Sequence, residues 1–175
     1  PKSLQLAIEN GTIRRVYFAG QGTAGIAALT CANILKYYLA SPDINIKALK
    51  ASELSGFEIS EFEKEDSMTD TLVVAISQSG TTTDTNKAVD MVKNLGAWTL
   101  AIVNRRDSDL TLKADGVLYT SSGRDIEMSV ASTKAFYSQI VAGALLSLFF
   151  VKLAKKRNRA FISDELKSLL KLPDY

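Results

Sequence analysis

Hydroxyl side chains gather at one place in this sequence, directly after an apolar run. Residues 71–76, TLVVAI, are uncharged and mostly β-branched or aliphatic, and they are followed by SQSGTTT, in which five of seven residues carry hydroxyls. The apolar run predicts a buried strand, and Gly80 permits a tight turn. A helical pattern follows at once, and its apolar positions are Ala88, Met91, Val92 and Leu95.

This strand, turn and helix N-terminus predict a pocket for an anion. Unpaired backbone N–H groups and the positive end of the helix dipole favour a phosphate, and hydroxyls can donate to its oxygens. No Lys or Arg lies between Thr71 and Asn86, so the pocket is expected to work through neutral donors. The alternative is that the hydroxyls only cap the helix. One hydroxyl suffices for a cap, so their density favours ligand binding.

Two other loops follow predicted strands and have a similar polar character. Residues 20–25, GQGTAG, match a GxGxxG pattern, and Glu53 stands roughly where a dinucleotide-binding fold places an acid. The hydroxyl cluster is unneeded for a dinucleotide, and Thr23 could contact a small ligand. A sugar-contacting loop is therefore favoured over an NAD site or a simple tight turn.

The third loop, residues 121–132, precedes a long apolar helix. Glu127 could act as a base or orient a sugar hydroxyl, or it could cap the helix, which is slightly favoured. Arg124 and Lys134 are interpreted first as solvated surface residues, although Lys134 could face the crevice and Arg124 could meet an anion.

The elements that must position these loops alternate between strands and helices. This alternation predicts βαβ units and a parallel sheet covered on both faces. Ligands of such sheets bind beyond the carboxyl ends of the strands, where the three loops would converge. The expected strands are 14–19, 44–51, 71–76, 98–103 and 116–120, and the main helices are 26–40, 84–95, 108–114, 130–155 and 162–170.

Composition narrows the class of protein. With 175 residues, 46% apolar and 23% charged, the chain suits one ordinary globular domain. A net charge of +2 argues against a general nucleic-acid binder. The uncharged stretch 135–151 is 17 residues long and contains polar side chains. It is therefore predicted to be a buried core helix, with no membrane partner.

Cys31 is the one cysteine, and the chain contains no histidine. A lone cysteine forms no intramolecular disulfide, which favours a reducing cytoplasm. Its apolar helical context favours packing over nucleophilic chemistry. Without imidazole, the commonest general base and many zinc sites are absent. No metal and no cofactor are expected.

Three segments together resemble a known family. SQSGTTTDT (77–85), VASTKAF (130–136) and GQGTA (20–24), in this spacing, resemble the sugar isomerase (SIS) domain family, and most of all the first SIS domain of glucosamine-6-phosphate synthases. The resemblance implies a three-layer αβα sandwich with a five-stranded parallel, flavodoxin-like sheet. It assigns phosphate binding to Ser77, Gln78, Ser79 and Thr82, and sugar contacts to Thr23, Val130 and Ser132.

The sequence also departs from the family pattern. Ala24 stands where a serine is usual, which removes one donor to the sugar, and Gln21 replaces a common cysteine. An Arg124–Asp125 pair precedes VASTKAF. The change at Ala24 leaves the identity of the sugar and the affinity for it open.

The resemblance implies a division of labour between this chain and other segments. Residues 1–158 are expected to form the phosphosugar-binding domain, with 159–175 a helix or linker toward a further domain. The ligand would be of the fructose-6-phosphate or glucosamine-6-phosphate type. The parent protein would isomerise this phosphosugar, with or without amination, using catalytic groups that lie outside this chain. Catalytic residues within this chain are unknown.

Two alternatives stay open. One is a phosphosugar-sensing or regulatory module without chemistry, and the other is a lone homodimeric isomerase that uses Glu127. The long apolar helix predicts a homodimer in each case, because it offers more nonpolar surface than one sheet face needs.

Overall fold

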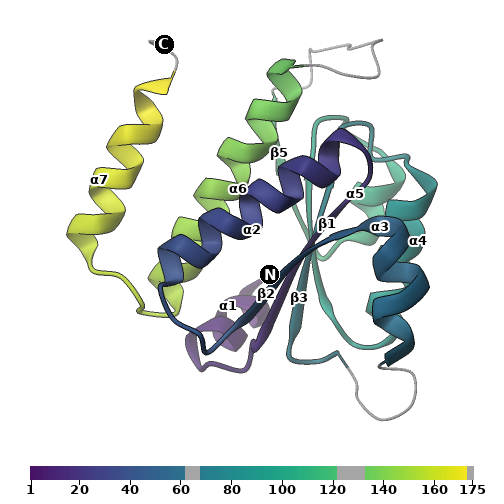
Figure 1. Ribbon diagram of the computed structural model, residues 1–175, viewed down its shortest axis with the longest axis horizontal. Coiled ribbons are helices and arrows are strands. Elements are labelled where there is room, and N and C mark those ends of the chain that lie inside the picture. Colours follow the sequence, from purple (N-terminus) through teal and green to yellow (C-terminus); the bar gives the residue numbers. More distant parts are fainter. Residues whose placement is uncertain (62–67, 122–132, 173–175) are drawn as a thin grey trace.

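The computed structural model describes residues 1–61, 68–121 and 133–172 and contains one five-stranded parallel sheet (Figure 1). The strand order is β2-β1-β3-β4-β5, which is a flavodoxin-like order and confirms the predicted α/β class. The strands are β1 (Arg15–Gly20), β2 (Asn45–Lys50), β3 (Thr71–Ser77), β4 (Trp98–Val103) and β5 (Gly116–Tyr119).

Helices cover both faces of the sheet, so the molecule has three layers (Figure 1). One face carries α1 (Lys2–Glu9), α2 (Thr23–Leu39), α6 (Thr133–Leu153) and α7 (Arg159–Leu170). The other carries α3 (Ala51–Glu53), α4 (Thr83–Asn94) and α5 (Asp109–Lys113), with the short π-helical and 3-10 turns η1 (Leu54–Glu58) and η2 (Ile59–Glu61).

Burial explains why the strands could be found from apolar runs. All seven residues of β3 are buried, because β3 is central and both of its faces are covered. The edge strand β5 is only partly buried. The core on the α2 and α6 side includes Phe18, Leu35, Leu72, Ile102 and Leu148.

The long apolar helix α6 packs against α2, as the prediction of a core helix required. Among the described residues, α6 is the one helix that is long and apolar enough to cross a membrane, judged by length and composition only. Cys31 is fully buried on the side of α2 that packs against α6, and burial raises the pKa of its thiol to about 12. This supports packing rather than nucleophilic chemistry.

The last helix begins earlier than its pattern predicted, at Arg159 instead of Ile162. The Asn158 side chain accepts a hydrogen bond from the Phe161 N–H at 2.9 Å and so caps the first turn. None of the described residues of α7 is buried. The division of the chain at residue 158 stays a prediction.

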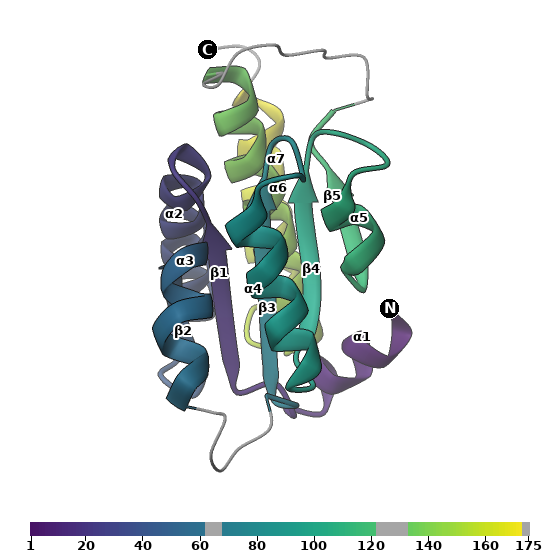
Figure 2. The same ribbon diagram turned by 90° about the vertical axis from the view of Figure 1, so that its right-hand side faces the viewer.

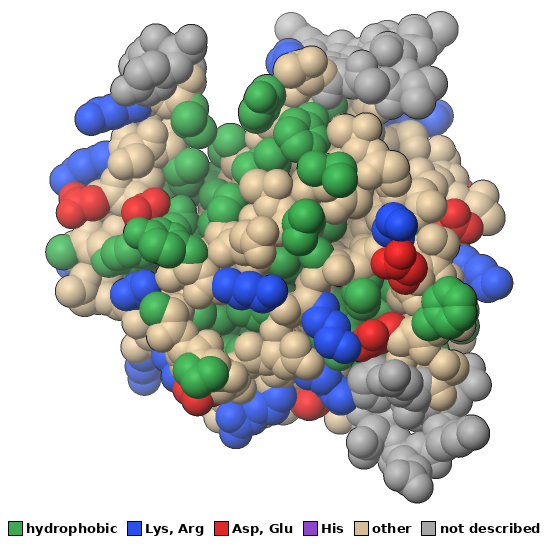
Figure 3. Space-filling view, viewed as in Figure 1, with side chains coloured by type: hydrophobic (Ala, Val, Ile, Leu, Met, Phe, Trp, Pro, Cys, Tyr) green, Lys and Arg blue, Asp and Glu red, His purple; other side chains and the backbone are tan. Residues whose placement is uncertain are grey.

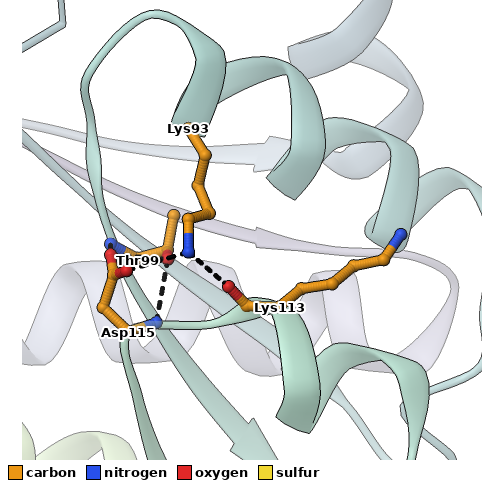
Figure 4. Close-up of polar contacts among 4 residues, drawn as sticks. All are labelled: Lys93, Thr99, Lys113 and Asp115. Atoms are coloured by element: carbon orange, nitrogen blue, oxygen red, sulfur yellow. Dashed lines mark hydrogen bonds and ion pairs between the residues drawn. The ribbon is translucent and has the colours of Figure 1, made fainter.

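A polar cluster fastens α4, β4 and β5 together at the amino-end edge of the sheet (Figure 4). The Asp115 carboxylate accepts hydrogen bonds from the Thr99 N–H at 2.8 Å and the Thr99 hydroxyl at 2.9 Å. The Lys93 ammonium lies 2.9 Å from the Asp115 carboxylate and also donates to the Lys113 carbonyl. Burial opposes ionisation, yet Lys93 and Thr99 together hold the pKa of Asp115 below its usual value.

Candidate functional site at the carboxyl ends of the strands

The turns after β1 and β3 lie side by side where the strands finish, at the carboxyl-end edge of the sheet. Gly20, the last residue of β1, is paired with Ile76 near the end of β3. The strand order reverses between these two strands, which is where ligands of open α/β sheets bind. Figure 2 shows both turns at the same end of the molecule, leading into α2 and α4 on opposite faces of the sheet.

Hydrogen bonds between residues two or three positions apart shape the turn after β3. The Ser77 hydroxyl oxygen accepts from the Gly80 N–H at 3.0 Å, and the Ser79 hydroxyl oxygen accepts from the Thr81 N–H at 3.2 Å. Gly80 has a φ of +67°, and a Cβ there would lie 2.0 Å from the Ser108 hydroxyl oxygen. The turn therefore requires glycine both for its backbone conformation and for its contact with the next turn.

The hydroxyl residues do not cap α4 in the expected way. Thr82 occupies the N-cap position, but its side chain makes no capping hydrogen bond. Asn86, one turn into the helix, donates instead to the Gly80 carbonyl at 3.0 Å and the Thr82 carbonyl at 3.1 Å. The capping interpretation therefore fails for Thr82, and the start of α4 keeps N–H donors available for an anion.

The turn after β1 is shaped by close backbone contact. A Cβ on Gly20 would lie 2.6 Å from the Ala24 carbonyl oxygen, so only glycine lets the end of β1 approach the first turn of α2 so closely. Gly22 occupies the N-cap position of α2, where no side chain caps the helix. Thr23 follows it and is exposed.

Glu53 is engaged in a way that does not suit a nucleotide ribose. It accepts a hydrogen bond from the Lys50 N–H at 3.2 Å and pairs with the Lys50 ammonium. The hydrogen bond from the Lys50 N–H, and after it the hydrogen bond from the Lys50 side chain, hold the pKa of Glu53 below its usual value. The residue caps α3, which removes the acid that the dinucleotide alternative needed.

Five of the predicted ligand residues lie together at this edge. Ser77 is buried, Gln78, Ser79 and Thr82 are partly buried, and Thr23 is exposed. Val130 and Ser132 lie outside the described residues, as do Arg124, Asp125 and Glu127. Lys134 is described and exposed in the first turn of α6. The assignment of these residues to a ligand stays a prediction.

The turn after β4 belongs to the same edge and was missed from the sequence. Asn104 and Arg105 both donate their backbone N–H groups to the Gln78 carbonyl, at 3.2 Å and 3.1 Å. The Asn104 side chain also accepts a hydrogen bond from the Ser121 hydroxyl at 2.5 Å. Two arginines, Arg105 and Arg106, therefore stand beside a turn that lacks any cation of its own. These arginines could be placed beside the β3 turn only from the order of the strands, and the spacing of residues along the chain does not give that order.

Among residues 1–61, 68–121 and 133–172, no group of three or more Cys, Asp or Glu side chains is placed to hold a metal ion. Hydroxyls, backbone amides and two arginines are the groups that the described part of this edge offers. Such donors suit an oxyanion better than a divalent cation, because a cation requires oxygen or nitrogen acceptors.

The model of the SIS domain family matches residues 55–149. A glutamine–fructose-6-phosphate aminotransferase (isomerizing) of Fusobacterium nucleatum is 38% identical over 158 residues, which cover 87% of this chain and 24% of that protein. The chain therefore spans about a quarter of the length of this relative.

Solved structures agree with this family match. The C-terminal domain of glucosamine-fructose-6-phosphate aminotransferase from Francisella tularensis superimposes with a TM-score of 0.81 at 26% identity, over 98% of this chain and 45% of that one. A protein of Escherichia coli CFT073, solved in complex with a ligand, has a TM-score of 0.67 at 21% identity, over 93% of this chain and 81% of that one. The second likeness concerns the fold alone.

Proposed function

Because the chain belongs to the SIS domain family, we propose that it binds a phosphosugar at the carboxyl ends of β1 and β3. The phosphate would be held by Ser77, Ser79, Thr82 and the backbone near Gln78. Thr23, Val130 and Ser132 would contact the sugar. The bound molecule would be of the fructose-6-phosphate or glucosamine-6-phosphate type.

The observation that supports this proposal is the open start of α4. Thr82 makes no capping hydrogen bond, so no N-cap side chain takes up the first N–H groups of α4. The Asn86 amide fastens the turn through the Gly80 and Thr82 carbonyls and leaves those N–H groups untouched. The N–H groups at this helix start, the partly buried Ser79 and Thr82 and the positive end of the helix dipole lie at the reversal of strand order. This is the combination of donors that a phosphate monoester requires.

The reaction of the parent protein would be ketose–aldose isomerisation, with or without amination. The relatives are named as isomerizing glutamine–fructose-6-phosphate aminotransferases, and this chain covers 24% of one of them and 15% of another. Isomerisation needs a base that moves a proton between C2 and C1 of the open-chain sugar. We propose that another domain or subunit supplies this base and that the present segment positions the sugar against it.

A sensing or regulatory module is the second candidate. The chain has no histidine, and Glu53, which follows β2 at the carboxyl-end edge, is held by Lys50. The described part of this edge therefore offers hydroxyls, amides and arginines rather than a free base. The fold also makes up 81% of the chain in one structural relative, so it occurs in chains with little beyond it. Ketose–aldose exchange by the full-length protein would distinguish the enzyme from the sensor.

We also propose that the α2 and α6 side contacts a second copy of the chain or a further domain of the parent. Figure 3 shows hydrophobic side chains gathered over α2 and α6 and along the hollow beside α7. The exposed large apolar residues of these helices are Ile26, Leu29, Tyr37, Tyr137, Leu145, Phe149, Leu166 and Leu170. A cytoplasmic location is part of the same proposal. Sedimentation that finds only monomer at high concentration would contradict a homodimer.

Titration calorimetry with fructose-6-phosphate and glucosamine-6-phosphate tests the binding proposal. Ser79→Ala is expected to weaken binding by ~1–3 kcal/mol, because the hydroxyl would donate to a charged group. Ser168→Ala on α7 is the matched control and should bind like the wild type. Ser79→Ala should lose only about 1 kcal/mol of stability and stay folded, because its hydroxyl bonds only with Thr81 in the same turn. A thermal melt establishes that the variant is folded. No binding by the wild type at millimolar sugar would contradict the proposal.

A further inference from the structure

We propose that Arg105 is a specificity-determining residue that adds a positive charge to the phosphate site from the turn after β4. This inference rests on the proposed function and deepens it. It assigns the site to a dianionic phosphate monoester, whose charge neutral hydroxyls and amides alone would leave uncompensated.

The position of Arg105 follows from two hydrogen bonds of its backbone, one to the turn after β3 and one within its own turn. Its backbone N–H donates to the Gln78 carbonyl at 3.1 Å, inside the turn that carries the candidate phosphate donors. The Ser108 hydroxyl donates to the Arg105 carbonyl at 3.2 Å and so holds the other side of the residue. A side chain that leaves the backbone at this point starts directly beside the β3 turn. The long arginine stem gives the guanidinium ample reach along it.

The Arg105 side chain is available for a ligand. It is exposed, and in the part of the chain that the structure describes no carboxylate or carbonyl pairs with it. Other cross-element cations behave differently, since Arg15, Lys47, Lys93, Lys113 and Lys156 each form an ion pair with an Asp or Glu. An exposed arginine alone would carry no meaning. Arg105 is a candidate ligand residue because it lies beside an uncharged turn and a helix start that no side chain caps.

Arg106 is the natural control because it has the same charge and stands next in the chain. Its guanidinium lies 4.4 Å from the centre of the Tyr119 ring, which is a cation–π contact with the edge strand β5. Arg106 is also exposed, but this contact directs it away from the β3 side. Two adjacent arginines therefore differ in whether a partner within the protein already holds them.

The test measures binding of fructose-6-phosphate and of inorganic phosphate by calorimetry at two salt concentrations. Arg105→Gln is expected to weaken the binding of both ligands by roughly 10-fold, which is typical of a lost charge-assisted hydrogen bond. It should also reduce the salt dependence of the affinity, because a screened attraction has been removed. Arg106→Gln should change the affinity less than about 2-fold, and thermal melts of both variants establish that they are folded.

The outcomes separate this inference from the proposed function. If Ser79→Ala weakens binding as expected while Arg105→Gln binds like the wild type, the phosphate site stands and the role of Arg105 is overturned. Equal losses in Arg105→Gln and Arg106→Gln would also overturn it, because they would indicate only the general charge of this end. Absence of any binding by the wild type would overturn the proposed function, and the inference with it.

Discussion

The two ends of the parallel strands differ in whether their polar groups are paired within the protein. At the amino-end edge, charges from different elements are paired: Arg15 with Asp70, Lys93 with Asp115, and Lys156 with Asp43. At the carboxyl-end edge, the hydroxyls of the β3 turn, the start of α4 and the Arg105 side chain have few or no partners across elements among the described residues. Paired groups serve the fold, and groups left open are available for a ligand.

This contrast separates stability from binding. Changes at the amino-end edge should alter the free energy of unfolding without altering phosphosugar affinity. Changes at the carboxyl-end edge should divide into those that break the scaffold of the turns and those that remove an open donor.

Gly20→Ala should have the largest effect, because it breaks the scaffold of the carboxyl-end edge. The new Cβ would lie 2.6 Å from the Ala24 carbonyl oxygen, and backbone cannot rotate away as a side chain can. We expect a loss of about 3 kcal/mol in the free energy of unfolding, measured by urea denaturation. Gly56→Ala is the control, since nothing lies within 4 Å of a Cβ there. A Gly20→Ala variant as stable as Gly56→Ala would contradict this description of the turn.

Asn86→Asp should be the next most damaging change. The Asn86 amide donates to the Gly80 and Thr82 carbonyls, and a carboxylate would place oxygen against oxygen at both contacts. We expect a loss of about 2 kcal/mol in the free energy of unfolding at neutral pH, measured by urea denaturation.

Asn86→Ala is the comparison for this change and should lose only about 1 kcal/mol. The Gly80 carbonyl still accepts from the Leu110 N–H, and the Thr82 carbonyl still accepts from the residue 86 N–H. Equal stability of the Asp and Ala variants at neutral pH would show that the amide donor does not matter.

Asp115→Asn tests the amino-end edge and its dependence on pH. The pKa of Asp115 is held below its ordinary value of 3.8, so its contribution is present above that pH and is lost as the pH falls through the folded-state pKa. The variant should be about 1 kcal/mol less stable than wild type at neutral pH, and the difference should shrink below pH 3.8. Its phosphosugar affinity should equal that of the wild type. A loss of affinity would break the contrast between the two edges.

Ala24→Ser should have the smallest effect and concerns binding alone. Ala24 lies in the first turn of α2, where the resembling family usually has a serine. A hydroxyl there should strengthen phosphosugar binding by about 0.5–1 kcal/mol in calorimetry. Ala27→Ser is an unsuitable control because Ala27 is fully buried, so Thr30→Ser on the same helix serves instead. Weaker binding by Ala24→Ser would indicate that the small residue is an adaptation to the ligand.

Much of the fold could be predicted from the sequence because its signals are local. The apolar run of β3, the GQGTAG turn and the breaks between helices each depend on residues close together in the chain. The last helix begins three residues before its apolar pattern because Asn158 caps it, and apolar spacing does not include that signal. The parallel sheet followed from the alternation of elements.

The candidate site was only partly visible in the sequence. Ser77, Ser79 and Thr82 could be picked out because they are adjacent, and adjacency in a turn is a local property. That Thr82 makes no capping bond, and that the Asn86 amide fastens the turn through the Gly80 and Thr82 carbonyls, depends on where the folded backbone places these groups. Sequence spacing does not give those positions.

Local residue patterns are therefore enough to predict the strands, the turns and the chemical character of each turn. Which turns meet depends on the order of the strands in the folded sheet. Arg105 lies well beyond Gln78 in the chain, and it reaches Gln78 only because β4 pairs with β3. Pairing of parallel strands joins segments distant in sequence, so the charge beside the hydroxyl turn comes from the order of the sheet and not from any motif.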